Sequence, residues 1–418
     1  MFGRLYLVIF AIGIIFLPFT RAFTIDVGAP IKLYEGIFAA AIFSFVLSGM
    51  PIERSVLRRY GIPLLMFLGS VTISYILALF ADNRAQFDFR GGVAVDGFLR
   101  IGYLVINIFV FALSYRLAKE YPRRMMQLWL AGMTISVLYL VYCALALRLT
   151  GEAFMLPGIE RHQLGDFGPI TIVRSGTFEE GNFGGFYFLL SIIVAMLAGY
   201  PALALVALVG LVLTKSTSAY FGLVALVGFY ILLRRHFRVI VVPVIAVVAA
   251  AIYGLFTYFE HEGKFEAGNS SGAVRMNEVM TAIEMFKEHV LFGVGLGQYG
   301  FKYYLYHWDP SLDALSTTAR HITNNIYAEL LAETGLVGCL IFAVFWARWL
   351  GQARRLIPVT PLFYASGISM MIVWLAYPTF NIAFMWAFLG FAVAMMNRAE
   401  TRTSTPAPRT LDSRAIAS

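Results

Sequence analysis

The chain has 418 residues, of which 60% are hydrophobic and only 13% are charged, with a formal net charge of +8. A soluble domain carries about 25% charged residues, so this composition excludes an ordinary soluble protein. The positive charge falls mostly in short loops between apolar runs, which indicates membrane topology and not nucleic-acid binding. Cys143 and Cys339 lie within apolar runs and indicate neither a disulfide framework nor a thiolate metal site.

Apolar runs recur from the N-terminus to residue 396, and most are long enough to cross about 30 Å of hydrocarbon as a helix. The first run lacks a small-residue cleavage site, so we interpret it as a retained span. We therefore expect an all-α polytopic membrane protein. The sequence predicts about 12 spans, at 5–20, 31–50, 61–80, 99–117, 125–148, 183–199, 201–214, 217–233, 239–258, 334–350, 359–377 and 379–396.

More than half of the 32 lysines and arginines fall in every second segment between the expected spans. This positive-inside pattern predicts that both termini are cytoplasmic. Two long loops then face the other side of the membrane, at Gly151–Asn182 and, between the ninth and tenth spans, at Glu260–Thr323. We expect residues 1–396 to form one integral membrane domain and residues 397–418, rich in Ser, Thr, Pro and Ala, to form a disordered cytoplasmic tail.

Arg275 is the extracytoplasmic residue that points most directly to a ligand. Apolar residues follow it at helical spacing from Met276 to Val290, so we expect a helix with one apolar stripe. The helix dipole disfavours a cation in the first turn unless an anion also lies there. A guanidinium beside exposed backbone N–H groups suits phosphate oxygens. The alternative is a local ion pair with Glu278.

Arg174 and Lys215 lie at two other turns on the same side. Arg174 begins the run RSGTFEEGNFGGFYF and either pairs with Glu179 or Glu180 or binds a ligand. Lys215 begins the run KSTS between the seventh and eighth expected spans, where a simple helix cap is the alternative. Taken as a set, the cations on this face predict an anionic ligand.

The polar run RHITNN extends from Arg320 to Asn325 and precedes a helix that leads into the tenth span. If the helix begins within this run, His321 lies within one turn of Asn324 and Asn325. A histidine there suits a general base because it titrates near neutral pH, whereas a solvated loop histidine is the alternative. The four histidines of this loop lack metal-ligand spacing, so we expect no metal and no cofactor.

These residues resemble the O-antigen ligase and polysaccharide polymerase family. The segment SSGAVRMNEVMTAIEMFKEHVLFGVGLGQYGF is similar to the family's arginine-led helix and glycine-rich turn, and NNIYAELLAETGLVG is similar to its following helix. The upstream runs RSGTFEEGNFGGF and LTKSTSAYFGL are similar to two further family segments. The resemblance implies a glycosyltransferase-C-like architecture and metal-independent, inverting glycosyl transfer on the periplasmic face of the bacterial inner membrane.

Carried over by position, Arg275 takes the family's arginine role in binding the diphosphate of an undecaprenyl-diphosphate-linked glycan. Asn324 stands where the family has a histidine that activates the acceptor hydroxyl, and Asn325 matches the asparagine after it. Because asparagine cannot take a proton, either His321 supplies the base or the enzyme belongs to a polymerase branch that works without it. The predicted catalytic residues are His321, Asn324 and Asn325, and the predicted diphosphate-binding residues are Arg174, Lys215, Arg275 and Arg320.

The favoured prediction is a polymerase that joins undecaprenyl-diphosphate-linked oligosaccharide repeat units to an acceptor glycan, as for O-antigen or exopolysaccharide. The alternative within the family is an O-antigen ligase that transfers the glycan to lipid A core. A transporter or flippase of an anionic lipid-linked substrate would instead place paired charges in the middle of its spans. The expected partners are the lipid-linked donor, the acceptor glycan, the lipid bilayer and other polysaccharide assembly proteins, and no nucleic acid.

Overall fold

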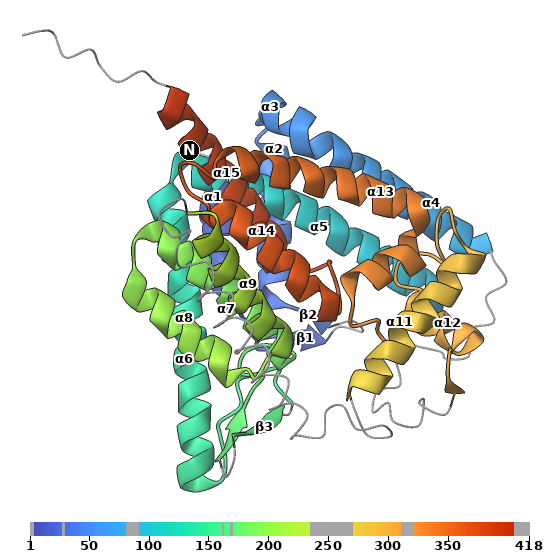
Figure 1. The fold of residues 1–418 in the computed structure, drawn as a ribbon, viewed down its shortest axis with the longest axis horizontal. Helices are drawn as coiled ribbons and strands as arrows, with labels where there is room; N and C mark the ends of the chain where they lie inside the picture. Colours follow the sequence, from blue (N-terminus) through green and yellow to red (C-terminus); the bar gives the residue numbers. More distant parts are fainter. Residues whose placement is uncertain are drawn as a thin grey trace, which may run out of the picture.

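The structure is a computed structural model that describes residues 4–26, 30–80, 92–160, 163–167, 170–234, 271–310 and 321–404. These residues are mostly helical (Figure 1). The longer helices are α1 (Leu5–Phe16), α2 (Leu33–Leu47), α4 (Ile62–Phe80), α5 (Gly92–Glu120), α6 (Pro122–Thr150), α7 (Gly181–Ala198), α8 (Pro201–Leu213), α9 (Thr217–Leu232), α11 (Ser271–Glu288), α12 (Tyr299–Tyr306), α13 (Ile326–Arg355), α14 (Leu362–Val373) and α15 (Ala383–Ser404). Short helical segments are α3 (Arg54–Val56), the π-helix η2 (Leu57–Gly61) and the 3₁₀-helix η5 (Trp374–Ala376).

Two short antiparallel hairpins lie in loops between helices and are not among the predicted elements. β1 (Ile25–Asp26) pairs with β2 (Pro30–Ile31). β3 (Leu164–Phe167) pairs with β4 (Ile170–Val173). The prediction of a helical protein is confirmed, and the hairpins are local additions to it.

A helix lies at each expected span that falls within the described residues. Five helical segments are long and apolar enough to cross a membrane, at Arg54–Phe80, Ala94–Glu120, Pro122–Thr150, Gly181–Ala198 and Ile326–Arg355. Shorter apolar helices account for most of the other expected spans. The ninth expected span, 239–258, lies outside the described residues, so the total of twelve stays a prediction.

Two of the basic loops that the positive-inside pattern groups together meet at one end of the molecule. Arg348 Nη1 donates hydrogen bonds to the backbone carbonyls of Arg58 (3.2 Å) and Arg59 (2.9 Å). Figure 1 shows the N-terminus and the end of α15 at this same, upper end. α15 runs to Ser404, past the expected end of the membrane domain at residue 396. The assignment of this end to the cytoplasm stays a prediction.

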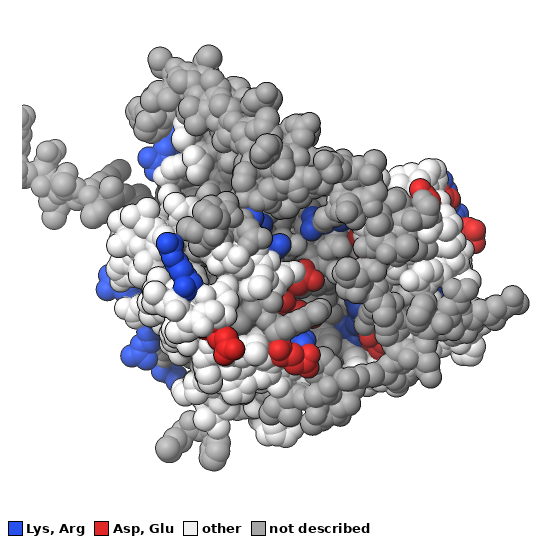
Figure 2. All heavy atoms as spheres, turned by 90° about the horizontal axis from the view of Figure 1, so that it is seen from below, with Lys and Arg blue, Asp and Glu red and all other residues white. Residues whose placement is uncertain are grey.

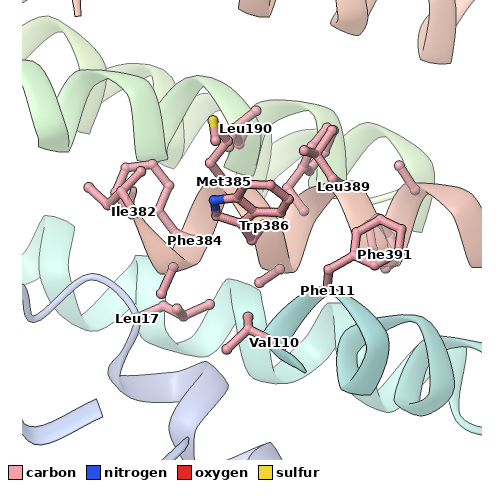
Figure 3. Packing of buried hydrophobic residues seen from close by; sticks show 14 of the residues in the cluster. Leu17, Val110, Phe111, Leu190, Ile382, Phe384, Met385, Trp386, Leu389 and Phe391 are labelled. Atoms are coloured by element: carbon pink, nitrogen blue, oxygen red, sulfur yellow. The ribbon is translucent and has the colours of Figure 1, made fainter. Parts of the chain in front are cut away.

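The hydrophobic core is centred on α15, which packs between α5 and α7 (Figure 3). Trp386 and Phe384 of α15 are almost completely buried. A Cβ atom on Gly390 would lie only 2.1 Å from the carbonyl oxygen of Phe111, so α15 and α5 approach closely only because position 390 has no side chain. Apolar side chains such as Met66 of α4 point outward, as suits a helix that faces lipid.

The glycine-rich turn Gly293–Gly297 packs into a break in α13. The break is at Gly335, whose φ of +63° and ψ of −167° are not helical. Val294 N donates to the carbonyl of Ala332 over 2.8 Å, which uses a carbonyl that the broken helix leaves unbonded. A Cβ atom on Gly335 would lie 2.5 Å from the carbonyl carbon of Leu291. Two segments that lie some 40 residues apart in the sequence are therefore joined by backbone hydrogen bonds.

α11 forms where the sequence predicts a helix led by Arg275, but its apolar stripe is not its buried face. Met276 is 63% exposed, whereas the polar residues Asn277, Glu278 and Thr281 are buried. α11 thus turns polar side chains toward the interior of the protein. This orientation brings a carboxylate into the region where the predicted cations lie.

Candidate active site

The β3–β4 hairpin fixes the position of Arg174. Arg174 follows β4 directly, and its backbone N–H donates to the carbonyl of Gln163 over 2.8 Å. The side-chain oxygen of Gln163 accepts a hydrogen bond from Gly181 N (3.0 Å), and Gln163 N donates to Ser175 Oγ (3.0 Å). Gln163 therefore ties the hairpin to the first residue of α7, with Arg174 held between them.

The start of α7 and the α8–α9 turn approach closely because α7 begins with small residues. A Cβ atom on Gly185 would lie 2.4 Å from Cβ of Ser216, and one on Gly181 would lie 2.7 Å from Nε of Arg174. Ser216 caps α9, since its side chain accepts a hydrogen bond from the backbone N–H of Ala219 over 3.4 Å. These glycines thus allow the two backbones to approach closely.

Lys215 is buried beside Arg174. It has a φ of +50°, which is uncommon for a residue with a side chain, and it is only 6% exposed. A Cβ atom on Gly165 would lie 3.2 Å from Cδ of Lys215 and 3.4 Å from Cδ of Arg174. The two side chains therefore both pack against this glycine of β3. Unusual backbone geometry at a buried cation is typical of a functional position.

Glu278 of α11 is the buried carboxylate closest to the predicted catalytic residues. Asn324 Nδ2 donates a hydrogen bond to Glu278 Oε2 over 2.9 Å. Burial raises the pKa of Glu278 to about 7, against the opposing effects of the Asn324 hydrogen bond and the charge of Arg275. Arg275 makes no ion pair with any residue that the structure describes, so the alternative of a simple local pair with Glu278 is not what the structure contains.

Glu180 connects the two arginines. Burial and the neighbouring Glu179 carboxylate raise the pKa of Glu180, while the charges of Arg174 and Arg275 lower it. Both guanidinium groups therefore lie near one carboxylate, although they come from different loops. We call Arg174, Lys215 and Arg275 the cation cluster. Figure 2, which views the lower end of the molecule, shows basic and acidic side chains gathered around a hollow in this face.

His321 is buried and not solvated. Its side chain is 1% exposed and stacks on the ring of Tyr303, with ring centroids 3.7 Å apart and planes 3° apart. His321 Nε2 and the Tyr304 hydroxyl are hydrogen-bonded over 3.0 Å. The helix that would set His321 one turn from Asn324 does not begin until Ile326, so that part of the prediction is wrong. The reading of His321 as a solvated loop residue is also wrong.

Asn325 caps α13 in the structure. Its Oδ1 accepts a hydrogen bond from Ala328 N (3.0 Å), and its Nδ2 donates to the carbonyl of Leu375 (3.0 Å). Both ends of the amide are thus engaged in positioning the start of α13. Arg320, the fourth predicted diphosphate-binding residue, lies outside the described residues.

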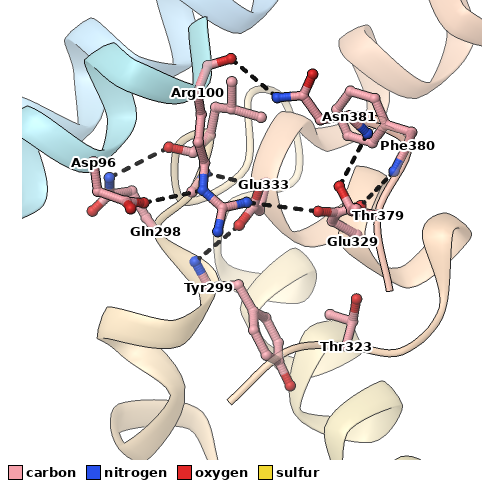
Figure 4. A network of polar contacts seen from close by, with 12 residues as sticks. Asp96, Arg100, Gln298, Tyr299, Thr323, Glu329, Glu333, Thr379, Phe380 and Asn381 are labelled. Atoms are coloured by element: carbon pink, nitrogen blue, oxygen red, sulfur yellow. Dashed lines mark hydrogen bonds and ion pairs between the residues drawn. The ribbon is translucent and has the colours of Figure 1, made fainter. Parts of the chain in front are cut away.

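A network of charged side chains supports the glycine-rich turn from behind (Figure 4). Glu333 of α13 accepts hydrogen bonds from Gly297 N (2.9 Å) and Tyr299 N (3.2 Å). Arg100 of α5 pairs with Asp96 (3.0 Å), and a longer contact of 3.9 Å joins it to Glu329. These buried charges are paired with one another and hold α5, α12 and α13 in place.

Two acidic residues of the site were not among the predicted site residues. Glu278 stands on a helix whose apolar residues suggested the opposite buried face, so it was considered only as an ion-pair partner of Arg275. Glu180 was considered only as a partner of Arg174. The signal that could have identified Glu278 is its spacing of three residues from Arg275, which places both on neighbouring positions of one helix face.

Comparison with known proteins supports the resemblance seen in the sequence. Residues 202–343 match the model of a family described as O-Antigen ligase. The match covers α8, α9, α11, α12 and the first part of α13, and the predicted resemblance is confirmed. The family implies glycosyl transfer at a membrane. No curated protein matches the chain.

Proposed function

Starting from the match of residues 202–343 to the O-antigen ligase family, we propose that this protein transfers glycan from an undecaprenyl-diphosphate carrier to an acceptor glycan. We propose polymerisation of repeat units as the reaction, because Asn324 stands where the family pattern has a histidine. Ligation of the glycan to lipid A core is the second candidate. The two reactions share a donor and differ in the acceptor.

The cation cluster binds the diphosphate of the donor in this proposal. The observation that carries it is that the charges of both Arg174 and Arg275 act on the buried Glu180 carboxylate, with the buried Lys215 beside Arg174. The first turns of α7 and α9 also lie here, and unbonded N–H groups at helix starts favour anions. Positive groups around the leaving diphosphate stabilise the charge that develops on it in the transition state.

Glu278 is the proposed general base. The acceptor hydroxyl oxygen attacks the anomeric carbon of the donor, and the bond from that carbon to the phosphate oxygen breaks. The electron pair of that bond leaves on the diphosphate, and the hydroxyl proton passes to Glu278. A carboxylate with a pKa of about 7 is about half ionised near neutral pH, which suits it to take up a proton.

His321 is the second candidate for the base. Its stacking on Tyr303 and its hydrogen bond to Tyr304 engage the imidazole ring unless the Tyr303–Tyr304 segment moves. Glu278 is bonded to Asn324, the residue at the position of the family histidine, and lies in the field of Arg275. These contacts favour Glu278. In this scheme Asn324 orients the carboxylate and Asn325 fixes the start of α13.

We propose that the site faces the periplasm, with both termini in the cytoplasm and the helices in the bacterial inner membrane. The positive-inside rule supports this orientation because two of the basic loops meet at one end. β3 and the start of α11, which carry parts of the site, lie at the opposite, lower end in Figure 1. The donor's polyprenyl chain then lies in lipid while its diphosphate reaches the cation cluster.

Purified protein given a lipid-linked repeat unit tests the proposed reaction. Products separated on a gel should form a ladder if the enzyme is a polymerase. Addition of a lipid A core acceptor, with formation of a single transferred product and no ladder, would identify a ligase. Absence of any product with the wild-type protein, under conditions in which it binds the donor, would contradict glycosyl transfer.

A further inference from the structure

A second cavity on the extracytoplasmic side lies away from the cation cluster. It has a volume of about 350 Å³ and is lined by the end of α4, the loop after α11 and one residue of α12. Its polar lining side chains are Glu288, His289 and Lys302. Arg275 and His289 are 14 positions apart along α11 and its last turn, which corresponds to about 21 Å of helix. The cavity is therefore separate from the proposed donor site.

Lys302 is a buried cation that has no acidic partner among the described residues. It is 6% exposed, and it makes no side-chain hydrogen bond or ion pair with any described residue. Burial lowers the pKa of its ammonium group, which is the direction expected when a charge loses water and gains no partner. Lysines are almost never this buried unless they are paired, so the described part of this site is suited to receive an anion.

The other polar groups of the cavity allow an anion to bind at Lys302. His289 Nε2 is hydrogen-bonded to the Tyr306 hydroxyl over 2.9 Å, and burial and the charge of Lys302 lower the pKa of His289. Glu288 is exposed and belongs to the rim. Its negative charge raises the pKa of both His289 and Tyr306, so it acts on the side of the cavity where these two groups lie. The cavity floor is therefore cationic and its rim is acidic.

The surroundings of the cavity are apolar and exposed. Leu77 and Leu291 line the cavity and are 49% and 61% exposed. Phe80, the last residue of α4, is 86% exposed. Large apolar side chains exposed at the end of a membrane helix are typical of a surface in contact with lipid. A ligand that reaches Lys302 along this surface has an apolar part and an anionic part.

We propose that this cavity binds the phosphate group of a membrane lipid, with Lys302 as its counter-ion and Leu77, Phe80 and Leu291 against the acyl chains. The ammonium group supplies charge-assisted hydrogen bonds to phosphate oxygens. The site stands on its own observations and does not depend on the proposed glycosyl transfer.

Lipid binding to purified full-length protein in a neutral detergent tests the proposal. The probes are phosphatidylglycerol, diacylglycerol with the same chains and soluble glycerol phosphate. We expect phosphatidylglycerol to bind, and the other two to bind at least about tenfold more weakly, because each lacks one of the two recognised parts. Glycerol phosphate binding as tightly as phosphatidylglycerol would assign the site to free phosphate esters and overturn the lipid assignment.

Substitution identifies the residue responsible. Lys302→Met should weaken phosphatidylglycerol binding by about tenfold or more, while Lys302→Arg should retain it. Lys287→Met is the matched control, since Lys287 is exposed on the neighbouring α11 and pairs with Glu284 over 2.6 Å. Lys302→Gln provides a second neutral variant if the methionine variant does not fold. Wild-type affinity in a folded neutral variant would contradict the proposal.

Discussion

Asn324 donates a hydrogen bond to Glu278 over 2.9 Å, and this contact links the polar run before α13 to the buried face of α11. Asn324 has a φ of +46°, a left-handed conformation that asparagine tolerates better than most residues. In the family pattern a histidine stands at this position. Here the asparagine side chain cannot take a proton, but it holds a carboxylate that can.

The pH dependence of the reaction should follow Glu278. Its pKa is raised to about 7, so the ionised base is present above that pH and kcat/KM should rise through about pH 7 to a plateau. The hydrogen bond from Asn324 lowers the pKa of Glu278, so Asn324→Gly should move the rising limb to higher pH. Glycine retains the positive φ while removing the amide. If the rise of kcat/KM occurs at the same pH in this variant as in wild type, Glu278 is not the titrating group.

Glu278→Gln should stabilise the protein at alkaline pH and lower its activity. The pKa of Glu278 rises from 4.5 to about 7 on folding, so the folded state binds more protons between these values and its stability falls as the pH rises through this range. Above about pH 7 the carboxylate costs about 3 kcal/mol, a cost that glutamine avoids.

Thermal unfolding in detergent at pH 5 and pH 8 measures this effect. The difference in Tm between Glu278→Gln and wild type should be small at pH 5 and clearly positive at pH 8. Equal differences at the two pH values would show that Glu278 does not titrate in this range. A stabilising substitution that removes activity is typical of a residue retained for function.

Arg275→Ala should lower transfer about 100-fold to 1000-fold, the scale observed when one group that stabilises developing negative charge is removed. Arg275→Lys should recover only part of the rate, since an ammonium group cannot form the two-pronged contact of a guanidinium. The control is Arg148→Ala, which removes an exposed arginine at the end of α6. Transfer at the wild-type rate by Arg275→Ala would show that Arg275 has no role in the reaction.

Gly185→Ala should disturb the site through packing alone. The added Cβ atom would lie 2.4 Å from Cβ of Ser216, and the strain should cost about 1–3 kcal/mol and displace the turn that carries Lys215. Gly69→Ala is the control, because no heavy atom lies within 4 Å of its Cβ position. We expect lower Tm and lower donor affinity for Gly185→Ala and neither for Gly69→Ala. Unchanged donor affinity in a variant with a lowered Tm would show that the turn carrying Lys215 is not part of the donor site.

Hydropathy was enough to predict the helices, because crossing a membrane demands a long apolar run whatever the tertiary fold. α6 and α13 lie where the apolar runs predict them. The break at Gly335 could not be predicted, since it depends on hydrogen bonds from a turn some 40 residues earlier in the chain. The β3–β4 hairpin is a similar case, because its four-residue strands leave little periodicity in the sequence.

The candidate site, like the fold, could be predicted from the sequence only in part. Arg174, Lys215 and Arg275 were identifiable because they are cations in segments that the positive-inside pattern predicts to be extracytoplasmic. Their acidic neighbours were not, because which face of α11 is buried is decided by tertiary contacts such as the hydrogen bond from Asn277 to Tyr303 (2.8 Å). His321 stood out in the sequence by residue type, while its stacking on Tyr303 depends on the fold.

Donor binding and single-turnover transfer, measured on the same preparations of wild type, Arg275→Ala and Glu278→Gln, test the proposed roles of Arg275 and Glu278 most directly. We predict that Glu278→Gln binds the lipid-linked donor as tightly as wild type but does not transfer its glycan, and that Arg275→Ala loses donor affinity. Transfer by Glu278→Gln at the wild-type rate, or undiminished donor binding by Arg275→Ala, would contradict these roles.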